Sequence, residues 1–211
     1  MGKNRAKNEK VKKKNLITIN QQVVLASSSQ TRQEEIRKYF DKVVLSKHKI
    51  NESQEKKEKQ LKAKDLAFYL ARLKAISISK DYKKSIIIGC DQILECNDKI
   101  FSKPKTLIEA KENLKELSGK KHKLFTCLYV LKNLREYFVE ESFAEVRFKK
   151  LTEREISDYV EKNKDTALSC VGSYKIEENE KHKFIKIIKG DIESIIGFPL
   201  KEFLKKARKE K

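Results

Sequence analysis

The stretch VVLASSSQTRQEEIRKYF, residues 23–40, begins as an apolar strand and ends as an amphipathic helix. Between the two halves lie three serines, a glutamine, a threonine and Arg32. In a strand–loop–helix unit, the loop hydroxyls and the free N–H groups of the helix point outward from the edge of the sheet, which makes an anion site. Arg32 adds a planar cation suited to bidentate phosphate binding. The alternative is that one hydroxyl is an ordinary N-cap and that Arg32 lies on the surface.

Strand and helix patterns alternate along the rest of the chain. Hydrophobic periodicity predicts strands at 23–26, 42–46, 85–95, 99–102, 123–131, 136–148 and 183–189, and helices at 31–40, 55–79, 107–117, 152–162 and 200–208. Interleaved strands and helices favour an α/β fold with a mixed sheet. With 211 residues, of which 38% are apolar, the chain can form one compact unit or two lobes around a cleft.

The formal net charge of +19 first suggests a polyanionic partner. Residues 1–14 hold seven Lys or Arg and one Glu, and therefore supply +6 of this charge. We expect residues 1–20 to form a basic, disordered tail and residues 21–211 to form a single domain. The remaining positive charge is spread along every predicted helix, and the sequence has no RNP, zinc-finger or recognition-helix pattern, which disfavours a nucleic-acid partner.

The cysteines and the hydropathy pattern indicate a cellular compartment. Cys90, Cys96, Cys127 and Cys170 show neither CxxC spacing nor a compact framework, which indicates reduced thiols in a cytosolic protein. No run approaches the roughly 18 apolar residues of a membrane span, and no apolar signal segment follows the basic N-terminus. We therefore expect a cytoplasmic protein with no membrane partner.

The segment SIIIGCDQILECNDKIFSKP, residues 85–104, places Asp91 at the inner end of an apolar strand. An ionised carboxylate there needs a metal, a cation or a catalytic role to offset its desolvation. The Asn-Asp pair that follows predicts a hairpin turn. A two-residue loop sets Lys103 opposite Gln92, whereas a three-residue loop sets it opposite Asp91, and either register brings an ammonium within reach of the carboxylate. The alternative is a surface ion pair.

The sequence allows two interpretations each for Lys74 and His122. Lys74 shares a helical stripe with Ala67 and Leu70, so it either snorkels outward or meets an anion inside a cleft. In a chain with 50 Lys and Arg residues, the helix alone favours snorkelling. His122 has no second histidine at ligand spacing nearby, which favours a structural role over metal binding.

Eight segments, in order from about residue 22 to the C-terminus, resemble the motifs of the Maf family of nucleoside triphosphate pyrophosphatases. LASSSQTRQEEI resembles the opening LASxSPRRxELL, KINES the (V/I)DE after the second strand, and LARLKA the helical LAxxKA. IIIGCDQIL resembles IIGADTVV, FSKPKT the GKP turn, and LSGKKHKLFT the SGxxHxxxT motif. CVGSYKIE and IIGFPL resemble the closing AGxYxI and VGLPL.

The resemblance implies a two-lobed α/β fold of the Maf/ITPase-like type around a nucleotide-binding cleft. It also implies a divalent metal cation, Mg²⁺ or Mn²⁺, and hydrolysis of a nucleoside triphosphate substrate to a monophosphate and pyrophosphate. Asp91 would act as metal ligand or general base, Glu52 would help to hold the metal, and Lys74 and Lys103 would neutralise the triphosphate. Such chemistry needs positioning and electrostatic stabilisation more than a covalent nucleophile.

The implied substrate-binding residues are Ser29, Arg32, Gln92 and Glu177. Ser29 and Arg32 match the phosphate-binding loop. Gln92 and Glu177 match the branch that resembles 7-methyl-GTP pyrophosphatases, which has DQ after the strand glycine and Glu after the GxYxI motif. The N7-methylated guanine ring is cationic and presents two adjacent donors, so a carboxylate can pair with that edge. The alternative for Glu177 is a surface position in the acidic loop EENE.

Two departures from the family pattern remove charge from the site. Gln30-Thr31 replaces the Pro-Arg of the loop, and Asn51 replaces the acidic partner of Glu52. A rival interpretation is a non-catalytic nucleotide-binding or partner-binding protein that acts in cell-division arrest. The sequence leaves the oligomeric state open, a homodimer included.

Overall fold

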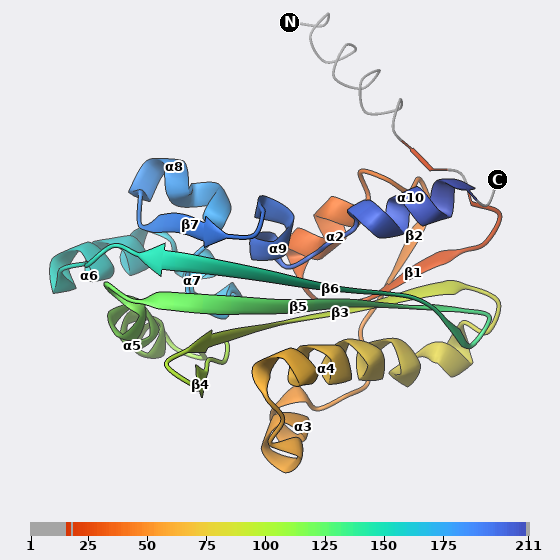
Figure 1. Cartoon of the computed structure of the whole chain (residues 1–211), viewed down its shortest axis with the longest axis horizontal. Coiled ribbons are helices and arrows are strands. Elements are labelled where there is room, and N and C mark those ends of the chain that lie inside the picture. Colours follow the sequence, from red (N-terminus) through yellow and green to blue (C-terminus); the bar gives the residue numbers. More distant parts are fainter. Residues whose placement is uncertain (1–15, 18, 210–211) are drawn as a thin grey trace, which may run out of the picture.

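The structure is a computed structural model that describes residues 16–17 and 19–209. Seven strands form one sheet in the order β2-β1-β3-β5-β6-β7, with β4 beside β3 (Figure 1). The strands are β1 (Val23–Ala26), β2 (Val43–Ser46), β3 (Ile86–Cys96), β4 (Lys99–Ile100), β5 (Lys121–Lys132), β6 (Arg135–Phe148) and β7 (Ile185–Lys189). β1 is parallel to β2 and β3, and the remaining pairs are antiparallel. The predicted α/β fold with a mixed sheet is confirmed.

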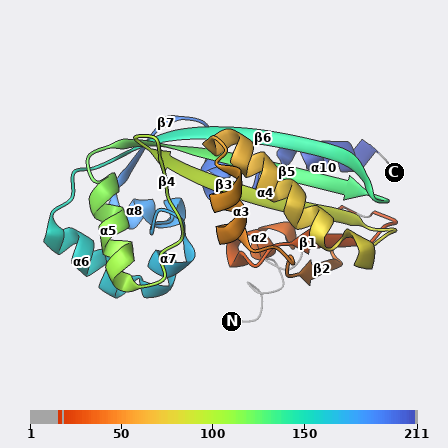
Figure 2. The same cartoon turned by 90° about the horizontal axis from the view of Figure 1, so that it is seen from below.

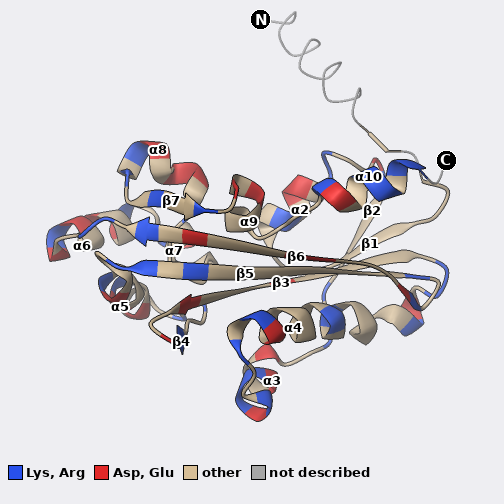
Figure 3. Ribbon diagram, viewed as in Figure 1, with Lys and Arg blue, Asp and Glu red and all other residues tan. Residues whose placement is uncertain are grey.

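Helices flank both faces of this sheet. They are α2 (Gln30–Ile36), α3 (Glu52–Lys59), α4 (Ala63–Ser77), α5 (Leu107–Leu117), α6 (Glu153–Lys162), α7 (Lys164–Ser169), α8 (Asn179–His182), α9 (Ile192–Ile196) and α10 (Lys201–Lys209), with the 3-10 turns η1 (Ser79–Asp81) and η2 (Ile176–Glu178). Lys and Arg lie on most of these helices, interspersed with Asp and Glu (Figure 3). The positive charge of the described residues is therefore distributed over the surface, as the sequence predicts.

The single helix predicted at 55–79 is wrong, because the chain forms two helices there. Gln60 has a left-handed backbone conformation with φ of 43° and ends α3. None of the residues of α3 is buried, whereas the buried stripe of α4 begins at Ala63. With no apolar stripe to hold residues 52–59 against the sheet, nothing keeps α3 in line with α4.

The molecule has two lobes joined by the long strands β3, β5 and β6 (Figure 2). In one lobe, alternate residues of β3 face opposite ways: Ile86 and Ile88 pack toward α10, and Ile87 packs toward α4. In the other lobe, the far ends of the same strands pack with α5, α6 and α7 in a separate hydrophobic cluster. The sheet is thus continuous while the core is divided.

A gap in strand pairing places the site between the lobes. β1 ends where Ala26 pairs with Gly89, and β4 begins where Ile100 pairs with Glu95. Between these points no strand lies beside that edge of β3 in the described chain, so its edge is open just after the parallel strands end. Ligand sites of α/β sheets lie at such carboxyl ends of parallel strands.

The N-terminal segment is only partly within the described residues. The predicted tail at 1–20 lies mostly outside them, but Ile17 is 4% exposed and its N–H donates to the Tyr39 carbonyl at 2.7 Å. Ile17 therefore packs with the core that contains β1. Among residues 16–17 and 19–209, no helix is both long enough and apolar enough to cross a membrane.

Candidate active site

A cavity of about 600 Å³ opens at the exposed edge of β3. Its walls come from the loop at 27–32, from α3 and α4, from the segment at 102–105 and from the loop around 168–177, so both lobes contribute. All eight predicted site residues line it: Ser29, Arg32, Glu52, Lys74, Asp91, Gln92, Lys103 and Glu177. The fold therefore gathers in one cleft residues that are spread over about 150 positions of sequence.

Lys74 forms the centre of the cleft. Its Nζ lies 2.5 Å from Asp91 Oδ1 and 2.9 Å from Glu52 Oε1. Lys74 is 5% exposed and Asp91 is 4% exposed. The outward snorkelling favoured by the helix alone is therefore wrong for Lys74, since its ammonium turns inward to two carboxylates from β3 and α3.

Close packing of α4 on β3 makes this contact, and Gly89 permits it. A Cβ atom at Gly89 would lie 2.1 Å from the carbonyl oxygen of Ala71 and 2.8 Å from the nitrogen of Ala75. Gly89 and Asp91 are two residues apart, so both face α4. Any side chain at Gly89 would push α4 away and move Lys74 from Asp91.

The pKa values of Lys74 and Glu52 are both shifted toward the charged form of the side chain. Burial by itself lowers the pKa of Lys74, but the nearby carboxylates of Asp91 and Glu52 outweigh it and raise this pKa. Burial would raise the pKa of Glu52, yet hydrogen bonds from His48 and Lys74 hold it far below its usual range. The two carboxylates thus favour the charged form of the lysine between them.

His48 belongs to this network and was missed in the sequence. Its Nε2 lies 3.1 Å from Glu52 Oε1, and its side chain is 9% exposed. The four-residue spacing in HKINE was the available signal, but residues 47–50 are not helical, so that spacing carried no structural meaning before the fold was known.

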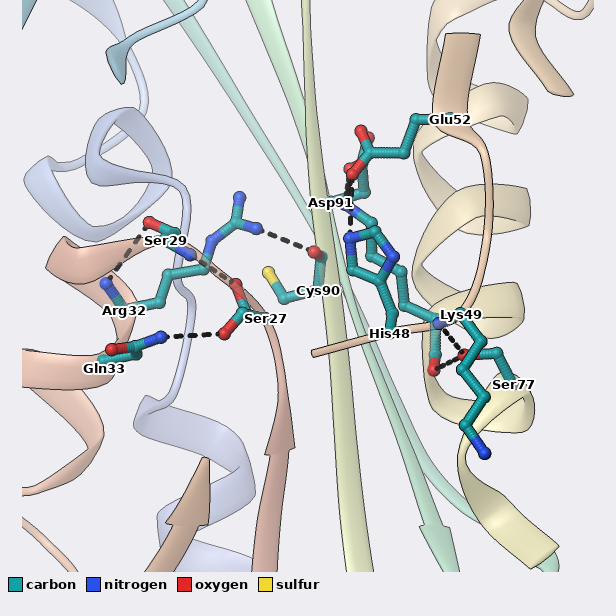
Figure 4. Close-up of polar contacts among 11 residues, drawn as sticks. Ser27, Ser29, Arg32, Gln33, His48, Lys49, Glu52, Ser77, Cys90 and Asp91 are labelled. Carbon is teal, nitrogen blue, oxygen red and sulfur yellow. Dashed lines mark hydrogen bonds and ion pairs between the residues drawn. The ribbon is translucent and has the colours of Figure 1, made fainter. Parts of the chain in front are cut away.

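Ser29 and Arg32 approach β3 from the other side of the strand (Figure 4). Ser29 is the N-cap of α2, and its Oγ accepts from the Arg32 N–H at 3.5 Å. The Arg32 guanidinium donates to the Cys90 carbonyl at 2.7 Å and to the Gly197 carbonyl at 3.0 Å. Arg32 therefore ties the loop to β3 and to the C-terminal segment. It is not a free surface residue, and any contact with phosphate would use the N–H groups that these two hydrogen bonds leave over.

The hairpin after β3 has the two-residue loop. Cys96 pairs with Lys99, and both turn residues have positive φ. The ladder ends at Ile100, so Lys103 leaves the sheet and is not paired across from Gln92. Much of Lys103 is exposed, but desolvation of its ammonium and the nearby charges of Arg32 and Lys74 lower its pKa.

Gln92 and Glu177 lie on different parts of the cleft wall. The amide nitrogen of Gln92 donates to Thr126 Oγ1 at 3.1 Å and to the carbonyls of Ser194 and Ile195, so it fastens α9 to the sheet. Glu177 lies in η2 and is exposed. Glu177 lines the cavity, so its carboxylate could contact the base of a bound nucleotide, and this role stays a prediction.

His122 is buried in the second lobe. Its Nε2 lies 2.6 Å from the Tyr174 hydroxyl, and burial lowers its pKa to about 4. It therefore stays neutral at physiological pH and supports Tyr174, whose ring lines the cleft. This placement agrees with the predicted structural role.

The oxygen atoms of the site fit a divalent cation that completes its coordination with water and substrate. Asp91 Oδ2 is buried and has no hydrogen-bond partner. Among the described residues, no group of three or more His, Cys, Asp and Glu side chains could hold a metal alone. Mg²⁺ is commonly held by one or two carboxylates together with waters and substrate phosphates, a set that Asp91 and Glu52 can supply.

Comparisons with known proteins identify the family of the chain. The 7-methyl-GTP pyrophosphatase of Bartonella henselae is 37% identical over 154 residues, which is 73% of this chain and 77% of that protein. The protein of the same name from Bartonella quintana is 33% identical over 88% of this chain and 94% of its own. The nucleoside triphosphate pyrophosphatase of Rhodopseudomonas palustris (strain BisB18) is 33% identical over 70% and 72%. Residues 22–210 match the family profile described as Maf-like protein, and the chain therefore belongs to the Maf family.

Proposed function

We propose that this protein hydrolyses nucleoside triphosphates to a monophosphate and pyrophosphate, with 7-methyl-GTP as the preferred substrate. The observation that carries the proposal is the buried Lys74, held between Asp91 and Glu52 at the wall of a cleft rich in cations. Phosphoryl chemistry depends on positioned charge, and these side chains are held in place by contacts within the protein itself.

Each central residue has a task in this reaction. Lys74 engages only Oδ1 of Asp91, which leaves Oδ2 to accept a proton from the attacking water or to bind a cation. The ammonium lies between Asp91 and Glu52 and offsets the repulsion between their carboxylates. Lys103 lies on the same cavity, where its charge would offset that of the phosphates.

Asp91 and Glu52 are the residues that would hold the divalent cation, Mg²⁺ or Mn²⁺. When bound, this cation supplies positive charge to the phosphate oxygens and to the leaving pyrophosphate. His48 and Lys74 both contact Oε1 of Glu52, which fixes the carboxylate and leaves Oε2 to face the ligand.

The preference for 7-methyl-GTP rests on Glu177 and on the relatives named for that substrate. Glu177 lies on the same cavity as Asp91, and its carboxylate could pair with the donors and the positive charge of the methylated base. Leu94, Leu124 and Ile176 line the same cavity and offer apolar surface to a ring.

The test is release of pyrophosphate from a panel of nucleotides by the purified protein with Mg²⁺ or Mn²⁺. We expect the highest kcat/KM for 7-methyl-GTP, above that for dTTP or UTP. A higher kcat/KM for dTTP would contradict the preference for 7-methyl-GTP but would still support the pyrophosphatase activity. Tight nucleotide binding without pyrophosphate release would instead support the non-catalytic binding protein.

A further inference from the structure

The cleft carries more positive charge than its own carboxylates can balance. Six cationic side chains and three carboxylates line it. The cations are Arg32, Lys56, Lys74, Lys103, Lys105 and Lys175. Two of them are engaged, since Arg32 donates to main-chain carbonyls and Lys74 contacts Asp91 and Glu52. The other four lysines have no hydrogen bond or ion pair through their side chains to any described residue.

Lys56 differs from the other free lysines because a helix presents it to the cleft. On α3, Glu52, Ser53 and Lys56 line the cavity, a spacing that places them on one helical face. Another face turns to α4, where Glu55 accepts from the Tyr69 hydroxyl at 2.7 Å and Lys59 lies 5.9 Å from the same ring. These polar contacts orient a helix that has no buried residue.

The usual partner of Lys56 is already occupied. A glutamate four residues before a lysine normally forms an ion pair along the helix. Here Glu52 Oε1 is contacted by Lys74 at 2.9 Å and by His48 at 3.1 Å instead. Lys56 therefore lies half-buried on the wall of the cavity that Asp91 and Glu52 also line, and its ammonium has no ion pair with a described residue.

The loop at 27–32 brings only one cation to the cleft. This cation is Arg32, and two of its N–H groups already donate to carbonyls. Gln30 is turned to Glu34, to which its amide donates at 2.8 Å, and Thr31 is uncharged. A triphosphate carries about four negative charges. Because Arg32 and Gln30 are already hydrogen-bonded within the protein, most of these charges would be balanced by the lysines across the cleft.

We propose that Lys56 is a further substrate-binding residue, whose ammonium pairs with the polyphosphate chain of the bound nucleotide. The proposal rests on the proposed function for its ligand, but it concerns binding and can be tested without turnover. Inorganic tripolyphosphate is the probe, because it has the charge of the chain and no base.

The experiment compares Lys56→Ala with Lys57→Ala in the full chain. The two lysines are neighbours on α3, and Lys57 is exposed and does not line the cavity. Both changes remove one charge, and alanine favours the helix. By calorimetric titration with tripolyphosphate and Mg²⁺, we expect Lys56→Ala to raise Kd about tenfold, which corresponds to about 1.4 kcal/mol, and Lys57→Ala to change it less than about twofold. In about 0.5 M NaCl the difference should shrink, because salt screens a half-exposed ion contact.

The outcomes separate this inference from the proposed function. Equal Kd values for the two variants, or a difference that high salt leaves unchanged, would overturn the inference even in an active pyrophosphatase. A difference between the variants in a protein that releases no pyrophosphate would support the binding role and overturn only the hydrolytic function.

Discussion

Lys74 Nζ lies 2.5 Å from Asp91 Oδ1, and each side chain is 6% exposed. A buried ion pair of this kind is costly to break, since removal of one partner leaves the other charge without compensation. The pair also connects α4 to the open edge of β3, so the stability of the lobe and the chemistry of the cleft share the same two side chains.

Asp91→Asn is expected to lower kcat/KM at least about 10²-fold. The amide keeps the shape of the side chain but cannot take a proton or offset a metal's charge. Pyrophosphate release measures the effect, and Asp98→Asn is the control, because Asp98 lies in the hairpin turn and asparagine tolerates its positive φ of 60°. Near-normal turnover by Asp91→Asn would transfer the catalytic role to Glu52.

Lys74→Met should cost both stability and activity. The methionine fills the space but leaves Asp91 and Glu52 facing each other, and loss of one partner of a buried ion pair costs about 3–5 kcal/mol. Urea unfolding measures the loss of stability, and Lys64→Met on the same helix is the control, because the Lys64–Glu141 pair is exposed on both sides and should contribute little. A loss of activity without a loss of stability would mean that Lys74 faces substrate alone.

Gly89→Ala should destabilise the protein by about 3 kcal/mol or more, because the new Cβ would overlap the backbone of α4 at Ala71. It should also lower kcat by displacing Lys74. Gly119→Ala is the comparison. The nearest atom to its new Cβ would be Lys150 Cβ at 3.7 Å, so only the backbone strain at φ +74° should reduce stability, by about 1 kcal/mol. Equal destabilisation by the two changes would show that α4 can shift without cost.

Glu177→Gln should narrow the preference for 7-methyl-GTP over dTTP by roughly 1–3 kcal/mol in kcat/KM. The amide keeps one acceptor and loses the charge that balances the methylated ring. Glu180→Gln is the control, because Glu180 is exposed nearby and does not line the cavity. An unchanged ratio in Glu177→Gln would place Glu177 on the surface without a role in recognition.

Burial of His122 predicts a loss of stability in mild acid. Its pKa is lowered to about 4 in the folded protein, against about 6.5 in the unfolded chain. Between these values only the unfolded state binds the proton, so stability is full above pH 6.5 and falls as pH decreases toward 4, by about 1.4 kcal/mol per pH unit. Urea unfolding from pH 7 to 4 should show this slope reduced in His122→Gln. Identical slopes in both proteins would assign the acid sensitivity to other groups.

The sequence by itself determined where the main strands lie along the chain, the mixed α/β class and, through the family resemblance, the residues expected in the cleft. The hydrophobic pattern marks the strands, so β3, a continuous apolar run, and β6 lie within one residue of the predicted bounds. The resemblance of the motifs from residue 22 onward to the Maf family implied the eight site residues, and all eight line the cavity.

The tertiary structure decided how those residues are engaged. The inward turn of Lys74 depends on the approach of α4 over Gly89, and the role of His48 depends on a contact across a loop of irregular backbone. The clamp formed by Arg32 joins atoms 165 residues apart. Periodicity reports which face of an element is apolar, but the partner of a polar side chain is set by distances between elements, which no local pattern contains.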